Sequence, residues 1–478
     1  MIQALINIFK IPDLRNKILF TLAMLAIYRI GFWIPIPGIS QESIAERMAS
    51  QAAGNALQRS MSFVAIFTGG SLQQSTIFGL GIMPYISAAI IFQLLSSAYE
   101  PLKKKQNEGP SGRQQIQEWT RYVTVGLCIL QGIGYLALFR SQGFIYPNWT
   151  NNPMWWVMAI TAMTAGTIFL MWLGEQIDKY GIGNGVSLII TAGILTGMPG
   201  AFQWVIGESP MRDLGIFRAL MGGEKIAGEP ALSWLEVIFL AASFVFVVAG
   251  AVLMTVAQRR IPVQQAKHTR GRKVYGGQRS YLPLRVNHGG VMPIIFASSL
   301  MIFPSVIFAT IAESTQATGG WLHGIAQFIS DAMHSGQFPY VVLYIILVYF
   351  FSYFWTTVQF NPEDMSKQLR DHGSFIPGLR PGPRTAEYLE AVMERITYVG
   401  AGFLAIIAIV PMVASSAMGI PFTVAQFLGG TGLLIVVSVG LDFIQRIEAS
   451  LLMRNYAGFL GGEDRGGRGS RIRGPRTV

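Results

Sequence analysis

The 478-residue chain is 51% apolar and only 13% charged, whereas a soluble globular protein carries roughly 25% charged residues. Too few charges are present to cover several water-exposed domains, so the composition indicates an integral membrane protein. The single cysteine, Cys128, cannot form an internal disulfide, and glycine shows no three-residue period, which excludes a disulfide scaffold and a collagen-like chain.

Ten apolar stretches follow one another along the chain, each close to the ~20 residues that a helix needs to cross a bilayer core. They lack the alternation of apolar and polar residues that is typical of membrane β-strands. The sequence therefore predicts an all-α integral membrane protein with ten transmembrane helices. The stretches lie at 18–37, 76–95, 119–139, 154–174, 184–206, 233–256, 288–310, 338–358, 395–414 and 430–450.

The basic residues are unequally divided between the two sides of these spans. Of the 36 Lys and Arg residues, 29 fall on the side that holds both chain ends, 6 fall on the other side, and Arg29 lies within the first span. Because positive loops stay in the cytoplasm, both termini are predicted to be cytoplasmic. The spans divide into five and five, and an odd number in each half makes the halves run in opposite directions, as in the inverted repeats of many transporters.

The spans also set the expected domain boundaries. Apolar residues recur at helical spacing before the first span, which favours an interfacial amphipathic segment over a disordered leader. The Arg- and Gly-rich chain end has little apolar surface to bury and is expected to be disordered. The division is an amphipathic segment at 1–17, an N-terminal half at 18–206, an external connection at 207–232, a C-terminal half at 233–450 with cytoplasmic loops at 257–286 and 359–394, and a cytoplasmic tail at 451–478.

Residues 61–74 (MSFVAIFTGGSLQQ) are apolar for too short a run to cross a bilayer, because the run ends at Gly69 and Gly70. A short apolar piece on the outer side, followed by glycines and then a full span, is typical of a re-entrant segment. Such a segment is tolerated at membrane depth only where protein or a cavity surrounds it. An amphipathic surface loop explains the same pattern equally well.

Ionisable groups that could carry chemistry are nearly absent from the predicted spans. All five histidines lie in loops or at span ends, and the chain holds neither an HExxH motif nor a nucleophile elbow. Glu175 and Asp442 fall at cytoplasmic span ends, where water reaches them. The run Gly181, Gly183 and Gly185 has the wrong spacing for a dinucleotide-binding fingerprint, and it predicts a tight start of the fifth span.

The spans do offer pairs of aliphatic residues. Ile82 and Ile86 lie four residues apart near the start of the second span, and so do Val186 and Ile190 in the fifth, so each pair lies on one helix face. Most such residues face lipid or pack against a neighbouring helix. If these faces met at the centre of a bundle, they would form an apolar constriction that resists water and ions by dewetting.

The predicted cytoplasmic loop at 258–286 holds eight basic residues and no acid. A topogenic role needs only a few such charges, and Val274, Tyr275 and Leu282 are interleaved with polar residues as in an extended hairpin. This pattern favours a docking surface for a cytoplasmic partner over ordinary topogenic charge. The second large loop presents Arg380 within a turn-rich run at 375–382. The basic residues of the first loop are Arg259, Arg260, Lys267, Arg270, Arg272, Lys273, Arg279 and Arg285.

Five separated motifs occur in order: FGLGIMPYIS at 78–87, GIGNG at 181–185, LPLRVN at 282–287 with PIIFASS at 293–299, FIPGLRPG at 375–382, and GGTGLLI at 429–435. Together they resemble the SecY family, the channel subunits of bacterial protein translocases. The resemblance covers essentially the whole chain. It implies a protein-conducting channel in the bacterial cytoplasmic (inner) membrane, in which two inverted halves form an hourglass.

The resemblance also implies roles for particular residues. Spans two, three, seven and eight would form a lateral gate toward lipid, with Ser87, Gln131 and Ser299 facing it. The aliphatic waist corresponds to Ile82, Ile86, Val186, Ile190, Ile295 and Ile435. The plug that closes the pore from outside corresponds to the possible re-entrant segment, residues Ser62, Phe63, Val64, Ala65, Ile66, Phe67, Thr68, Gly69, Gly70 and Ser71.

The expected partners follow from the same resemblance. The basic loop, from Arg259 to Lys273, and Arg380 match regions that engage the motor ATPase SecA and the ribosome. The small membrane subunits SecE and SecG, signal sequences, unfolded preproteins and membrane lipid are the others. No catalytic residue, cofactor or metal is expected. The alternative function is a secondary transporter with inverted repeats, which would need charges or substrate-binding polar groups near the bilayer midplane.

Overall fold

The computed structural model describes residues 11–460 apart from 45–74, 142, 150–151, 209–233, 266–267, 271–272, 276–278, 316–320, 334–336, 419, 421–423, 425–426 and 428–429. Four expected segments therefore lie wholly or largely outside the described residues. They are the first ten residues of the amphipathic segment, the plug at 62–71, nearly all of the connection between the halves, and the Arg/Gly-rich tail.

Each of the ten predicted apolar stretches overlaps a helix. The helices are α2 (Pro12–Gly31), α5 (Met83–Ala98), α7 (Pro110–Ser141), α8 (Pro153–Tyr180), α9 (Gly185–Glu208), α11 (Trp234–Val256), α12 (Met292–Thr315), α14 (Phe338–Gln359), α16 (Pro383–Met418) and α18 (Thr431–Leu460). Within the described residues, five of them, namely α8, α9, α11, α14 and α16, contain segments that are long and apolar enough to cross a membrane. The helical fold class is thus confirmed.

Two predicted boundaries were wrong because local turn residues override hydropathy. The first stretch was predicted to continue to residue 37, but α2 ends at Gly31, and Pro35 instead forms a bridge with Thr76. The second was predicted to begin at residue 76, but α5 begins at Met83. The residues before it form turns, with Gly81 at φ +56°, a conformation that glycine adopts at little cost.

A small sheet projects from the helical bundle, as the interleaved pattern of the basic loop predicted. Strand β1 (Gln258–Gln265) pairs antiparallel with β4 (Arg279–Arg285) and with β5 (Ser374–Phe375), and β2 (His268–Arg270) pairs with β3 (Lys273–Tyr275). On β1, Ile261 and Val263 are buried. They pack with Leu389 and Val392 of α16, which fixes the sheet against the base of that helix.

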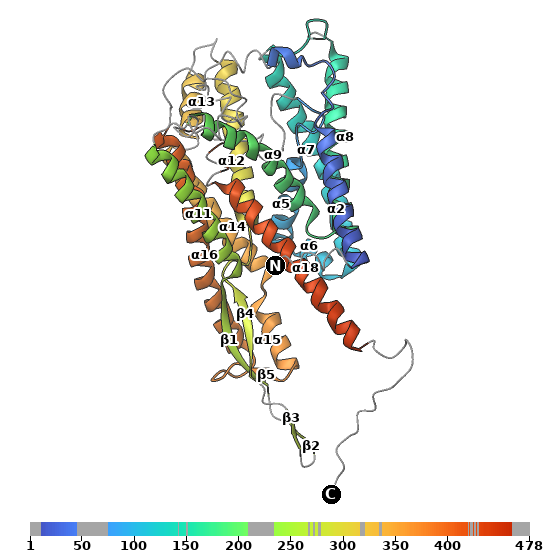
Figure 1. Cartoon of the computed structure of the whole chain (residues 1–478), viewed down its shortest axis with the longest axis vertical. Coiled ribbons are helices and arrows are strands. Elements are labelled where there is room, and N and C mark those ends of the chain that lie inside the picture. Colours follow the sequence, from blue (N-terminus) through green and yellow to red (C-terminus); the bar gives the residue numbers. More distant parts are fainter. Residues whose placement is uncertain are drawn as a thin grey trace.

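Figure 1 shows the helices in two groups, with α2, α5, α7 and α8 in one, α11, α12, α14 and α16 in the other, and α18 crossing between them. The sheet and α15 (Pro362–Asp371) lie at one end of the bundle, here called the sheet end. Helix α13 (Trp321–Ala332) lies at the other. Of the shorter helices, α6 (Glu100–Asn107) joins α5 to α7, and α15 joins α14 to β5.

The two halves repeat the same packing in opposite directions. In the N-terminal half α5 packs on α7, α7 on α8 and α2 on α8; in the C-terminal half α12 packs on α14, α14 on α16 and α11 on α16. Helix α11 leads directly into the sheet end, whereas α2 runs toward the α13 end. The inverted arrangement expected from the odd number of helices in each half is therefore present.

The largest hydrophobic cluster contains buried residues of both halves, including Ile86 and Leu173 from the first and Phe296 and Leu404 from the second. A second cluster around Trp155 and Leu136 lies entirely within the N-terminal half. The halves therefore share one apolar centre, and that centre is where a candidate pore must be sought.

Candidate pore constriction, lateral seam and basic sheet

The six aliphatic residues predicted for the waist all belong to the large shared cluster. Five of them are at most 5% exposed, and Val186 is partly buried and packs against this cluster. Both halves contribute, through four helices. The residues are Ile82 and Ile86 at the start of α5, Val186 and Ile190 of α9, Ile295 of α12, and Ile435 of α18.

The start of α5 places Ile82 and Ile86 on the same face. Ile82 is the N-cap residue, and the backbone N–H of Ile86 donates to the Ile82 carbonyl oxygen at 3.1 Å, so the two side chains lie one helical turn apart. Pro84 occupies the first turn, where a missing N–H costs no intrahelical hydrogen bond. Ile82 therefore belongs to the helix start itself, at the junction with the preceding turns.

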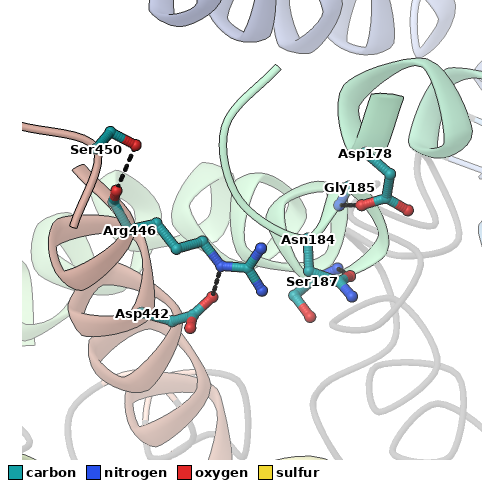
Figure 2. Close-up of polar contacts among 7 residues, drawn as sticks. All are labelled: Asp178, Asn184, Gly185, Ser187, Asp442, Arg446 and Ser450. Carbon is teal, nitrogen blue, oxygen red and sulfur yellow. Dashed lines mark hydrogen bonds and ion pairs between the residues drawn. The ribbon is translucent and has the colours of Figure 1, made fainter. Parts of the chain in front are cut away.

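The start of α9 is held by two side-chain caps (Figure 2). The Gly185 N–H donates to Asp178 Oδ1 at 2.7 Å, and the Ser187 N–H donates to Asn184 Oδ1 at 3.0 Å. A side chain at Gly185 would collide with the backbone carbonyl of Gly174 on α8. The glycine run thus permits the tight helix start that its spacing predicted, and it fixes the position of Val186 beside α8.

The cluster contains further buried aliphatic residues that sequence reasoning did not single out. Ile294 and Leu434 directly precede two predicted waist residues and are at most 1% exposed; Ile189 and Ile194 of α9 are 2% exposed. Neighbouring residues on a helix point about 100° apart, so spacing alone cannot distinguish those that face a central axis from those that pack between helices.

In the part of the chain that the structure describes, the halves make their broadest contacts along two seams, α5 with α12 and α9 with α18, and the α5–α12 contact is much the smaller. Ser87 and Ser299, predicted for the lateral gate, lie on α5 and α12 and are both buried. Each hydroxyl donates within its own helix, Ser87 to the Met83 carbonyl at 3.0 Å and Ser299 to the Ile295 carbonyl at 2.7 Å. Gln131, the third predicted gate residue, is half-buried on α7, which packs on α5.

The basic residues predicted for docking gather at the sheet end. Arg259 and Arg260 are exposed on β1, and Arg380 is exposed on the loop after β5. Because Gln264 of β1 pairs with Phe375 of β5, the sheet brings the two basic loops together. Of the remaining predicted residues, Arg270 and Lys273 lie on β2 and β3, whereas Lys267 and Arg272 lie outside the described residues.

The acidic residues at the predicted span ends are both paired within the chain. Glu175 of α8 accepts two hydrogen bonds from the Arg121 guanidinium of α7, at 2.9 and 2.7 Å. Asp442 of α18 accepts one from Arg446 Nε at 2.8 Å. The second pair has the i,i+4 spacing that can be recognised in the sequence. The residues of the first pair are 54 positions apart, on two helices, so no local sequence pattern predicts their contact.

These features define a class. The chain is a multi-pass helical membrane protein with two inverted halves, a shared aliphatic centre and a basic surface at one end. Among the residues that the structure describes, no group of three or more His, Cys, Asp or Glu side chains could hold a metal ion.

Comparisons with known proteins identify the family. The SecY family model matches residues 76–444. The chain is 41% identical to the protein translocase subunit SecY of Streptomyces coelicolor, over 96% of this chain and 100% of that protein. It is 39% identical to the corresponding subunit of Thermotoga maritima, over 96% and 98%. The chain therefore belongs to the SecY family of protein translocase subunits.

Solved structures show the same fold at lower identity. One described as the structure of a protein conducting channel has a TM-score of 0.58 and 21% identity over 94% of each chain. Sec61 in the canine ribosome-channel complex from the endoplasmic reticulum has a TM-score of 0.57 and 19% identity, also over 94% of each chain. Since SecY is a family of non-enzymatic translocation channel subunits, neither an intramembrane enzyme nor a secondary transporter is favoured.

Proposed function

We propose that this chain forms the path by which unfolded secretory proteins cross the bacterial cytoplasmic membrane, and that membrane segments leave it sideways into lipid. The waist would be the six aliphatic residues named above. The observation that carries the proposal is that five of these residues, from four helices and both halves, are buried in one cluster, and Val186 packs against that cluster. Flexible aliphatic side chains can close around any transiting side chain while offering it no hydrogen bond, so ions are excluded by dewetting.

The lateral exit is proposed between α5 and α7 on one side and α12 and α14 on the other. The smaller extent of the α5–α12 contact supports this choice. The segment 62–71 is proposed as the plug that covers the waist from outside. The sheet end would face the cytoplasm together with both termini, because the unequal distribution of basic residues favours that orientation.

The proposed partners at the sheet end are the SecA motor and the ribosome, and SecE and SecG are proposed as membrane subunits. Sec61, which shares the fold, occurs in a ribosome-channel complex. The exposed positions of Arg259, Arg260 and Arg380 on two loops that one sheet joins support a docking role. We expect Arg380→Glu to abolish SecA-driven translocation while the protein still accumulates in the membrane, because a carboxylate would repel the acidic surface that a guanidinium attracts. Normal motor-driven transport in this variant would contradict the docking assignment.

The waist is tested by cross-linking in membranes. Cys128 is replaced by Ser, a cysteine is placed at Ile86, and a secretory chain with its own single cysteine is stalled in transit. A disulfide that depends on the signal sequence is expected. A matched variant with its cysteine at Leu130, which is 68% exposed on α7, should not cross-link. If the stalled chain cross-links at other channel positions but not at Ile86, the waist lies elsewhere; if it engages no position, the channel function itself is wrong.

A further inference from the structure

A cavity of about 200 Å³ lies at the sheet end, between the start of α9, the segment that joins β4 to α12, and α18. Its polar lining comes from all three. The residues that matter here are Asn184, Ser187, Arg285, His288, Asp442 and Arg446. None of them belongs to the proposed waist, and only Arg285 belongs to the basic loop.

The floor of this cavity is shared with the apolar centre. Val291 and Val439 line the cavity and are also buried members of the cluster that contains the proposed waist. Met292 lines it too and packs against the same cluster. Val291 lies one helical turn before the waist residue Ile295, whose N–H donates to the Val291 carbonyl oxygen at 3.1 Å, and Val439 lies one turn after Ile435 on α18. The cavity is therefore one helical turn from the proposed waist, on the side where a polypeptide entering from the sheet end would pass.

Hydrogen-bond donors converge on this space from two helices. Arg446 uses Nε to bind Asp442, and Figure 2 shows the rest of its guanidinium pointing toward Asn184 and Ser187 at the start of α9. The Asn184 amide oxygen already accepts from the Ser187 N–H, so the amide group that remains on Asn184 is a donor. Planar guanidinium donors beside amide and hydroxyl donors match the geometry of a carboxylate.

The segment that joins β4 to α12, which forms the third wall of the cavity, is held in place by its own hydrogen bonds. The Val286 N–H donates to the Ala257 carbonyl at 3.0 Å, and Asn287 Nδ2 donates to the Gly290 carbonyl at 2.8 Å. His288 Nδ1 lies 3.0 Å from the Arg285 carbonyl oxygen. Because a carbonyl can only accept, Nδ1 carries the hydrogen. Arg285 also lines the cavity, so the lining contains two arginines and one carboxylate, that of Asp442. Burial raises the pKa of Asp178, and Arg446 lies close enough to oppose that shift, so a second carboxylate shares its field.

We propose that this cavity is a subsite for the Asp and Glu carboxylates of the polypeptide that enters the channel, and that it disfavours Lys and Arg at the same point. The entering chain is favoured over a docked partner because the cavity floor is continuous with the proposed waist. The inference deepens the proposed function and rests on it.

The test uses inside-out membrane vesicles that contain the full chain with its native partners, and three secretory clients that differ only in a six-residue tract of Glu, Lys or Ser. Each initial translocation rate is divided by that of the Ser client in the same vesicles, so a general loss of activity cancels. In the unsubstituted protein the Glu client should outpace the Lys client. Arg446→Gln should reduce the Glu-to-Lys rate ratio by about threefold, the size expected for a half-exposed ion pair, and Arg446→Lys should restore most of it.

Arg140→Gln is the matched control, since Arg140 is exposed in the last turn of α7 and does not line the cavity. It should leave the ratio at its original value. An equal ratio in Arg446→Gln and the unsubstituted protein would overturn the subsite. Failure of the unsubstituted protein to translocate even the Ser client would instead overturn the channel function.

A second measurement detects contact directly. In an Asp442→Asn, Arg446→Lys protein, a stalled client with the Glu tract at the constriction should form a zero-length carbodiimide cross-link to the new amine. The Ser client should form none. Equal cross-linking of the two clients, or none with either, would also contradict the subsite.

Discussion

The two seams between the halves differ in extent. Along α5–α12 the contact is small, and the buried hydroxyls of Ser87 and Ser299 bond within their own helices. Along α9–α18 the contact is broader, and the start of α9 is capped from its own half by Asp178 and Asn184. Separating the first seam thus breaks few contacts, whereas separating the second breaks a wider contact. We therefore expect α9–α18 to act as the hinge and α5–α12 as the opening.

The largest expected effect on transport comes from linking α5 covalently to α12. In a Cys128→Ser background, cysteines replacing Ser87 and Ser299 are joined with a bifunctional maleimide long enough to span two packed helices, whose axes lie about 8–10 Å apart. Translocation and lateral release should both fall to background, because α5 and α12 can no longer separate. Transport is measured before and after linking.

The matched control links α9 covalently to α18. Leu188 of α9 and Phe443 of α18 both lie beside Gly183, within 3.5 Å of a Cβ placed there, so cysteines at these positions are linked in the same way. Transport should largely survive. If the two linked proteins lose transport to the same extent, the distinction between hinge and opening is wrong.

A smaller effect is expected from disturbing the close packing at the start of α9. Gly185→Ala adds a methyl group that collides with the Gly174 backbone, and overpacking of this kind costs about 1–3 kcal/mol. The midpoint of thermal denaturation of the purified protein should therefore fall. Gly134→Ala on α7, whose added methyl group meets open space, is the control; an equal loss of stability in both would show that close approach at Gly185 is not what matters.

The role of the proposed aliphatic waist as an ion barrier is tested by polar substitution. Ile86→Asn or Ile435→Asn places an amide in a buried aliphatic cluster, at a cost of about 1–3 kcal/mol to the closed state. A cost of 1.4 kcal/mol changes an equilibrium tenfold, so ion leak through vesicles should rise by about an order of magnitude. Export of clients with weak signal sequences should also improve. Ile86→Val keeps the centre aliphatic and should change neither; an unchanged leak in both Asn variants would count against the waist.

The smallest effect concerns a contact within one half. The Arg121–Glu175 pair joins α7 to α8, and its side chains are 44% and 31% exposed, so it should stabilise the protein by about 1 kcal/mol or less. A double-mutant cycle with Arg121→Gln and Glu175→Gln, followed by thermal denaturation, measures the coupling. A coupling well above this value would mean that the N-terminal half depends on its polar sheet end as much as on its apolar packing.

The helices themselves could be predicted from the sequence, because each apolar stretch is long enough to favour the membrane whatever its neighbours do. Helix α11, for example, is apolar almost throughout Trp234–Val256. The basic hairpin was equally local, since Val274, Tyr275 and Leu282 are interleaved with polar residues, and they lie on β3 and β4. Boundaries failed where prolines and glycines, such as Pro35 and Gly81, impose turns inside apolar sequence.

By itself, the sequence determined the helical membrane class, the inverted halves and the motifs that identify the family. Only the tertiary structure decided that Ile86 and Ile435 share one cluster, that Gln264 pairs with Phe375, and that Arg446 turns toward Asn184. Hydropathy and helical spacing are properties of a single segment. Contacts between segments far apart in the chain depend on how whole helices pack, and only the folded arrangement of the two halves fixes that packing.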